Sequence, residues 1–324
     1  MRRRTFVTAG LAALASASVP QRRAAAAPAA AGGDIPAIGL DGRQLILTAS
    51  EVADLRSSLR GELMSAADGG YDAARRMWNA AFDRKPALIA RCAGAADVRR
   101  AVGFAAAHGL LTAVRGGGHS LSGQSVCDGG LVVDLSAMRG VLVDPVARQA
   151  RVQPGTLLGP VDRESAAFGL VTPLGTVADT GVAGLTLGGG QGRLSRKLGL
   201  TIDHLLEADV VTADGRWLRA SAAENPDLYW GVRGGGGNFG VVTSFTYRLQ
   251  ELAPLVYGGL VTLPYADARR VLRDYADICS AAPDELVSYI SFEFDRERRE
   301  RVIQLDVCCC AAPADAERLV APLR

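Results

Sequence analysis

The 324-residue sequence has little net charge, few aromatic residues and only three histidines. Its formal charge at pH 7 is +2, and no basic stretch is interleaved with aromatic side chains, so nothing indicates a nucleic-acid partner. Beyond the first thirty or so residues there is no internal repeat, no low-complexity segment and no apolar run long enough to span a bilayer. The sequence therefore predicts no stable membrane span.

The six cysteines do not form the pattern of a disulfide framework or a metal site. Cys92, Cys127 and Cys279 are isolated, and Cys308–Cys310 end a stretch that alternates like a half-buried strand. Neighbouring residues of a strand point to opposite faces, so this trio cannot ligate one tetrahedral ion. We expect no metal, and we interpret the cysteines as small buried side chains.

Residues 1–33 are best kept out of the fold. Arg2, Arg3 and Arg4 precede Thr-Phe-Val and then a short Ala-rich apolar stretch, a pattern that resembles a twin-arginine export signal and its linker. This predicts a periplasmic or secreted protein. The alternative is an ordinary disordered, basic, Ala-rich N-terminus.

Glycine is abundant, and its first dense run adjoins a histidine. Residues 87–92 read as a buried strand, 96–108 as an amphipathic helix and 111–114 as a second strand, which implies parallel strands joined by a right-handed crossover. Gly116–Gly118 then leave the carboxyl end of the second strand, where such sheets hold ligands, and bare backbone N–H groups can approach a pyrophosphate there. His119 would stand at the edge of a phosphate-bearing cofactor. The alternative is a glycine-rich turn with a solvated histidine.

A second dense run lies between Gly181 and Gly192, where apolar residues separate the glycines. A flexible linker would not carry Val182, Leu185 and Leu187. We interpret the run as backbone packed against an aromatic ring system and phosphates. The basic residues at 195–197 that follow could neutralise a diphosphate or form a solvent-facing turn.

Four stretches in order resemble one family: Arg115-Gly-Gly-Gly-His-Ser120, the stretch from Ser122 to Leu135, the run from Thr180 to Gly192, and Trp230-Gly-Val-Arg-Gly-Gly-Gly-Gly-Asn-Phe-Gly-Val-Val242. Together they resemble the PCMH-type FAD-binding domain of the berberine-bridge-enzyme-like oxidoreductases, within the vanillyl-alcohol-oxidase superfamily. The resemblance runs from about Trp78 to Leu249, roughly half of the chain.

The resemblance implies a role for each matching position. His119 matches the histidine that carries an 8α-linked flavin, residues 115–120 match the pyrophosphate loop, and residues 238–242 match a segment near the adenine end. The cofactor-binding residues implied are His119, Arg115, Gly116, Gly117, Gly118, Ser120, Ser125, Thr180, Gly181, Gly184, Gly188, Gly189, Gly190, Gly192, Asn238, Gly240 and Val242.

One position departs from the family pattern. Many members attach the flavin a second time, through a cysteine four residues before the Gly-Val-(Gly/Ala)-Gly run, and that position is Val177 here. Cys127 lies where the family has no linkage. We therefore expect FAD to be held by a single covalent bond, through His119.

The fold class expected is α+β: a PCMH-type domain of two α/β lobes, followed by the start of an antiparallel-sheet substrate domain. The domains predicted are a signal and linker (1–33), an N-terminal helical lead-in (34–77), the FAD-binding domain (78–250) and an incomplete substrate domain (251–324). Within these we expect a helix over 51–63 capped by Ser50, a helix over 71–82, and a change of lobe at about residues 154–168. The last domain should have β–α–β–β order and a further helix near Asp315.

The expected activity is hydride transfer from an alcohol, carbohydrate or secondary metabolite to the flavin, which dioxygen or another acceptor then reoxidises. No catalytic base is assigned, because the family places that residue beyond this chain or late in the substrate domain. The chain is expected to be a C-terminally truncated product or a divergent short member, so a non-catalytic flavin-binding remnant is an alternative. A nicotinamide-binding Rossmann enzyme is weaker, since Asp134 is the nearest candidate for its acidic residue.

Overall fold

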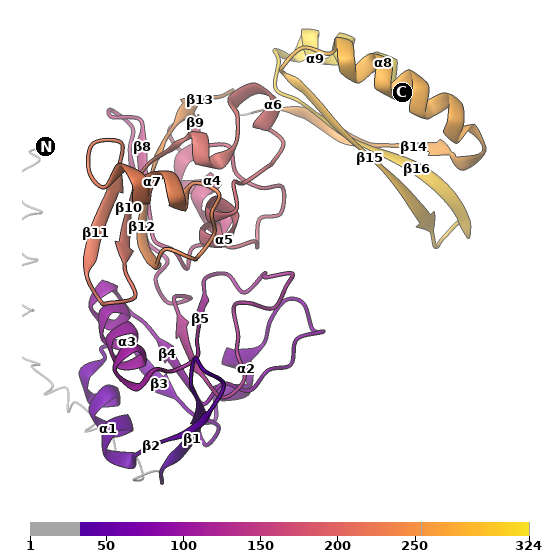
Figure 1. Ribbon diagram of the computed structural model, residues 1–324. Helices are drawn as coiled ribbons and strands as arrows, with labels where there is room; N and C mark the ends of the chain where they lie inside the picture. Colours follow the sequence, from indigo (N-terminus) through magenta and orange to yellow (C-terminus); the bar gives the residue numbers. More distant parts are fainter. Residues whose placement is uncertain (1–32, 254, 324) are drawn as a thin grey trace, which may run out of the picture. The chain divides into compact units, whose positions relative to one another are not determined.

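The computed structural model describes residues 33–253 and 255–323 (Figure 1). The predicted export signal lies, but for its last residue, in residues 1–32, outside the described part of the chain. Within the described ranges, none of the helices combines the length and the apolar composition needed to cross a bilayer.

The first lobe is built on a four-stranded sheet in the order β3-β4-β6-β5. Its strands are β3 (Glu62–Met64), β4 (Leu88–Arg91), β5 (Thr112–Arg115) and β6 (Leu131–Asp134). The last three are parallel, with β6 between β4 and β5, and β3 is antiparallel at one edge. The predicted parallel strands are therefore confirmed, although they are neighbours through β6 and not directly.

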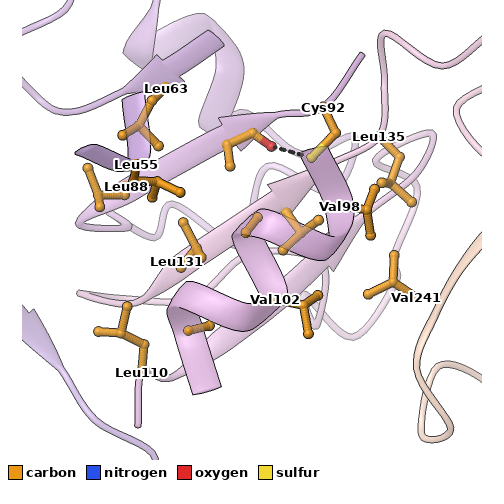
Figure 2. Close-up of a cluster of buried hydrophobic side chains, with 14 of the residues drawn as sticks. Leu55, Leu63, Leu88, Cys92, Val98, Val102, Leu110, Leu131, Leu135 and Val241 are labelled. Atoms are coloured by element: carbon orange, nitrogen blue, oxygen red, sulfur yellow. Dashed lines mark hydrogen bonds between the residues drawn. The ribbon is translucent and has the colours of Figure 1, made fainter. Parts of the chain in front are cut away.

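Helix α3 (Ala95–His108) joins β4 to β5 and covers the first-lobe core. Its buried residues include Val98, Ala101, Val102 and Ala105, which share one helix face because they are three or four positions apart. Figure 2 shows Val98 and Val102 in the cluster that also contains Leu88 and Leu131. Burial of a valine or leucine side chain contributes about 1.5–3 kcal/mol. The helix ends at Gly109, whose φ of 60° is the left-handed value that glycine adopts readily.

The N-terminal segment differs from the expected helical lead-in. Strand β1 (Ile35–Ile38) pairs with β2 (Gln44–Leu47), and β3 joins the first-lobe sheet. Helix α1 covers Ala49–Ser58 and is capped by Thr48, which forms a capping box with Glu51, so the prediction of a helix over 51–63 capped by Ser50 is wrong. Helix α2 covers only Tyr71–Arg75, because Arg76 is already extended.

The second lobe is built on a five-stranded antiparallel sheet in the order β11-β10-β12-β8-β7. Its strands are β7 (Val141–Asp144), β8 (Gln149–Val152), β10 (Leu205–Val211), β11 (Trp217–Ser221) and β12 (Val241–Arg248). Since β7 and β8 belong to this sheet, the change of lobe follows β6 and precedes the predicted position. Its helices are α4 (Leu158–Ala166), α5 (Val182–Leu187), α6 (Ser195–Leu198), η1 (Thr201–Asp203) and α7 (Pro226–Val232), and β9 (Leu170–Val171) pairs with β13 (Gln250–Glu251).

Strand β12 carries the centre of the second-lobe core. Phe245 and Tyr247 are fully buried, and their rings stack with centroids 5.9 Å apart. The hydroxyl of Tyr247 shares a hydrogen bond of 2.7 Å with the Thr186 hydroxyl of α5, and burial raises the pKa of Tyr247. This bond satisfies both buried hydroxyls and ties α5 to the sheet.

The last part of the chain has the predicted β–α–β–β order. Strand β16 (Glu300–Cys309) lies between β14 (Tyr257–Pro264) and β15 (Leu286–Asp295), and both pairings are antiparallel. The turn η2 (Tyr265–Asp267) leads into α8 (Ala268–Ala281), and α9 (Pro313–Val320) precedes η3 (Ala321–Leu323). Val271, Leu305 and Val320 belong to one buried cluster that joins the helices to one face of this sheet. The α+β class is confirmed.

Candidate functional site

The histidine loop leaves the carboxyl end of β5 directly after Arg115. Gly118 has a φ of 75°, a left-handed value that a side chain would strain. Its carbonyl accepts a hydrogen bond of 3.0 Å from the backbone N–H of Trp78. His119 follows at once and is half-buried.

Gly117 brings this loop into main-chain contact with the second glycine run. A Cβ on Gly117 would lie 2.4 Å from the Cα of Gly181, and a Cβ on Gly181 would lie 2.5 Å from the nitrogen of Gly117. Beside them, a Cβ on Gly116 would lie 3.2 Å from the Pro154 carbonyl oxygen. The two loops therefore meet through bare backbone, and each glycine is required because the other is there.

The second run turns from Thr180 into α5. Thr180 donates its N–H to the Val177 carbonyl (3.1 Å) and accepts from the N–H of Leu158 (3.0 Å). Gly184 lies on the exposed side of α5, and a Cβ there would meet nothing within 4 Å. A Cβ on Gly189, which follows α5 and has a φ of 109°, would also meet nothing within 4 Å. Open space therefore faces main chain at both positions.

The remaining glycines of this run, by contrast, are packed against protein. A Cβ on Gly188 would lie 3.2 Å from the Gly184 carbonyl oxygen, one on Gly190 2.2 Å from the Thr201 hydroxyl, and one on Gly192 1.8 Å from the Leu174 carbonyl oxygen. At these three positions the loop packs closely against other parts of the protein, and a side chain would not fit without a shift of the neighbouring atoms.

The third glycine run is bonded to the second. The N–H of Gly236 donates to the Leu187 carbonyl (2.9 Å), and the side-chain amide of Asn238 donates to the Gly235 carbonyl (2.9 Å). Gly240 has a φ of 135° and lies close to the Val211 carbonyl of β10. Val242 is buried among the second-lobe core residues, so its side chain packs inside the lobe. The structure thus links the three predicted loops in one chain of contacts.

The imidazole of His119 is stacked on Trp78, with ring centroids 5.4 Å apart and an interplanar angle of 19°. Within residues 33–253 and 255–323, neither ring nitrogen of His119 has a hydrogen-bond partner. The nitrogen atoms are therefore not committed to other protein groups. This stacking could not be predicted from the sequence, because 41 positions separate the two rings.

Arg115 lies beneath the loop. Its Nη1 donates to the Ala74 carbonyl at the end of α2, while its buried Nε has no partner in the described part of the chain. A Cβ on Gly118 would lie 3.0 Å from its guanidinium. Ser120 accepts the N–H of Gln124 (3.1 Å) through its hydroxyl, and Ser125 is half-buried further along. The guanidinium places a positive charge against the bare backbone at Gly118, which favours an anionic group near this loop.

The Cys127 thiol packs among buried side chains of the first lobe. Cys127 is buried in the first lobe, its Sγ lies 3.8 Å from the Leu131 carbonyl oxygen, and burial raises its pKa to about 11. Val177 is exposed. Within the described ranges, no cluster of three or more histidine, cysteine or acidic residues is arranged to hold a metal ion.

The basic residues after the second run bond to the last part of the chain. Arg193 makes two hydrogen bonds to the Asp306 carboxylate of β16, one of them 2.7 Å long. Arg196 donates to the Cys279 carbonyl (3.0 Å), and Lys197 pairs with Glu285 at 3.2 Å. Neither sequence alternative, diphosphate neutralisation or a solvent-facing turn, anticipated this role.

Glycine loops at the ends of two mixed lobes, with a histidine beside them, define an FAD-binding domain of the PCMH type. A family model described as an FAD binding domain matches residues 86–221. The chain belongs to the berberine-bridge-enzyme-like FAD-linked oxidoreductases of the vanillyl-alcohol-oxidase superfamily. The family predicted from the four motifs is therefore confirmed.

Two curated relatives show the kind of protein that resembles this chain. It is 40% identical over 205 residues to (R)-6-hydroxynicotine oxidase of Paenarthrobacter nicotinovorans, a match covering 63% of this chain and 45% of that protein. It is 38% identical over 197 residues to xylooligosaccharide oxidase of Thermothelomyces thermophilus, covering 59% and 39%. The chain spans about half the length of the curated relatives it matches.

Two solved structures share the fold. A crystal structure of 6-hydroxy-D-nicotine oxidase from Arthrobacter nicotinovorans superposes with a TM-score of 0.79 at 35% identity, covering 82% of this chain and 59% of that one. The berberine-bridge-enzyme-like protein 1 of Physcomitrella patens gives a TM-score of 0.77 at 28% identity, covering 84% and 59%.

Proposed function

We propose that this protein is an FAD-dependent oxidoreductase that takes a hydride from a C–H bond of an alcohol, a carbohydrate or a secondary metabolite. The observation that carries the proposal is the bare-backbone contact of Gly117 with Gly181 beside the unbonded imidazole of His119. The oxidase names of relatives that share this domain support the reaction class.

FAD, when bound, supplies a flavin ring that accepts the hydride and passes the electrons to dioxygen or another acceptor. The protein holds and orients this group. Gly117 and Gly181 hold the two glycine loops together, while the backbone at Gly184 and Gly189, where a Cβ would meet nothing within 4 Å, leaves open space for a flat ring or phosphates. The Arg115 guanidinium places a positive charge under the loop, which favours a diphosphate near it.

His119 would hold the flavin through a single covalent bond, from an imidazole nitrogen to the 8α carbon. His119 would lose its imidazole N–H proton on forming this bond, and because the bond also removes a hydrogen from the 8-methyl group, it would require a two-electron oxidant, dioxygen, which would be released as hydrogen peroxide. Two observations support one bond and not two. The thiol of Cys127 is buried, and the position of the family's second linkage is Val177.

Substitution His119→Ala tests the bond. The wild-type protein, precipitated with acid and washed, should keep its yellow colour, whereas the variant should release all its flavin into the supernatant. His108→Ala is the matched control, because His108 is bonded to Glu51 and Phe104 on α1 and α3 and should leave the linkage intact. Acid-stable flavin in His119→Ala would rule out this attachment.

Redox activity is tested separately from attachment. Purified protein, kept anaerobic, should lose its flavin absorbance near 450 nm when the right alcohol, sugar or hydroxylated heterocycle is added, and regain it with air. A protein that stays oxidised with every such compound but is reduced by dithionite would be a flavin-binding protein without this activity.

We also infer that the protein is exported from the cytoplasm. The inference rests on the arginines at positions 2–4 and the short apolar stretch after them, which resemble a twin-arginine signal. Fractionation of cells producing the full chain should place the flavoprotein outside the cytoplasm. Retention of all of it in the cytoplasm would contradict the inference.

A further inference from the structure

Residues 74–84 hold the histidine loop from one side. The Ala74 carbonyl accepts from Arg115, the N–H of Trp78 donates to the Gly118 carbonyl, and the side-chain amide of Asn79 donates to the Leu121 carbonyl (3.1 Å). Trp78 and Asn79 thus bond to the loop on both sides of His119. These bonds fix the loop on either side of His119. Among the residues that the structure describes, Trp78 is the one that makes an aromatic contact with the imidazole ring.

The direction of the imidazole depends on this contact. Its nitrogen atoms have no hydrogen-bond partner in residues 33–253 and 255–323, so no donor or acceptor there sets the ring's rotation about Cβ–Cγ. An aromatic neighbour at 5.4 Å and 19° favours one ring plane and disfavours the others. The hydrogen bond from the Trp78 N–H to the Gly118 carbonyl holds the main chain of Trp78 next to the main chain of His119.

We propose that Trp78 is a positioning residue for the bond between His119 and the flavin. The inference rests on the proposed function, because it concerns how the linkage forms. Bond formation between bound groups requires a near-attack geometry, and misplacement by about 1 Å can cost on the order of 100-fold in rate. Trp78 holds the plane of the imidazole so that a nitrogen, and not a ring face, is directed at the carbon that it joins.

Trp78 has little part in holding the fold together. Its side chain is 62% exposed, and it belongs to none of the buried clusters. Removal of the indole should therefore leave the first-lobe core intact and leave the glycine loops able to bind FAD. Attachment and binding can be separated by experiment for this reason.

The test uses the full chain made in cells deprived of riboflavin, purified, and then given FAD. Bound flavin is measured after gel filtration, and linked flavin after acid precipitation, as a function of time. Trp78→Ala and Trp78→Leu should bind FAD to within about twofold of wild type and form the linkage at least about tenfold more slowly. Trp78→Phe, which keeps an aromatic face, should restore most of the rate.

Trp217→Ala is the matched control, since Trp217 is a partly exposed tryptophan of β11 and contacts Arg219. It should link FAD at the wild-type rate. Linkage at the wild-type rate in both Trp78→Ala and Trp78→Leu would overturn the inference, and so would a slowing matched by an equal loss of bound FAD. Failure of wild type itself to form acid-stable flavin would instead refute the proposed linkage, and this inference with it.

Discussion

Gly181→Ala should destabilise the protein, because the two glycine loops leave no room for a methyl group. The added Cβ would lie 2.5 Å from the nitrogen and 2.6 Å from the Cα of Gly117, whereas ordinary contacts are 3.4–4 Å. One loop must move by about 1 Å, and neither can yield by rotating a side chain. The Thr180 carbonyl and the Val182 N–H, on either side, are hydrogen-bonded to Leu158 and Thr156.

The magnitude follows from two opposing terms. Overpacking of this kind costs about 3 kcal/mol, the upper part of the usual range, because both partners are backbone. Gly181 has φ −76° and ψ 133°, which alanine adopts without strain, so the smaller entropy of the unfolded chain offsets about 0.7 kcal/mol. The expected net loss is about 2 kcal/mol, or about 1 M in the urea midpoint for a slope near 2 kcal/mol per M.

Gly184→Ala, three residues away, is the control with the opposite sign. A Cβ at Gly184 meets nothing within 4 Å, and the residue lies inside α5, where alanine is favoured over glycine by about 0.5–1 kcal/mol. Urea unfolding followed by tryptophan fluorescence, with both variants free of FAD, measures the two shifts. Equal midpoints for Gly181→Ala and wild type would refute the argument that the loops meet through bare backbone.

Two further results are expected. In a double-mutant cycle measured by urea unfolding, Arg193→Ala and Asp306→Ala should show a coupling free energy of about 1 kcal/mol. The coupling should become smaller in 1 M salt, because the ion pair is bidentate but partly exposed. Additive effects of the two substitutions would show that the two side chains do not interact. The pKa of Cys127 is raised by burial from 9.0 to about 11, so its contribution to stability is present below pH 9 and lost as the pH rises toward 11. Iodoacetamide at pH 8, followed by peptide mass analysis, should accordingly spare Cys127 and modify the half-buried Cys279 first.

The sequence predicted those elements whose signals are local. The helix over 96–108 carries apolar residues at helical spacing and ends in glycine, and α3 covers Ala95–His108 with Gly109 left-handed at its end. The last part of the chain contains stretches typical of strands, and the predicted β–α–β–β order is confirmed. The glycine loops were also located, because their composition admits few other structures.

Three errors share a physical cause. The helix expected over 51–63 ends at Ser58, because Leu63 serves a sheet whose partner strand β4 is far along the chain. The helix expected over 71–82 ends at Arg75, since the residues that follow bond to the histidine loop. Strands β7 and β8 pair with each other, and β8 also pairs with β12, so their lobe is decided by a partner about a hundred residues away.

The candidate site was predicted as a set of positions but not as a geometry. The four motifs supplied the histidine and the glycines, while Trp78, Asn79 and the unpartnered Nε of Arg115 emerge only once the loops are folded. The role of Arg193 depends on Asp306, which lies 113 positions along. Contacts between residues so far apart in the sequence cannot be predicted from the spacing of neighbouring residues.

The bonds of Arg193, Arg196 and Lys197 have a consequence for exchanging modules between relatives. They begin one residue after the last glycine of the second run and end on Asp306, Glu285 and the close of α8. A chimera that replaces residues 257–323 must supply carboxylates for Arg193 and Lys197 and a main-chain carbonyl at the end of a helix for Arg196, or the residues after the second glycine run lose these bonds. Compatibility of the two halves therefore depends on matching acceptors for residues 193–197.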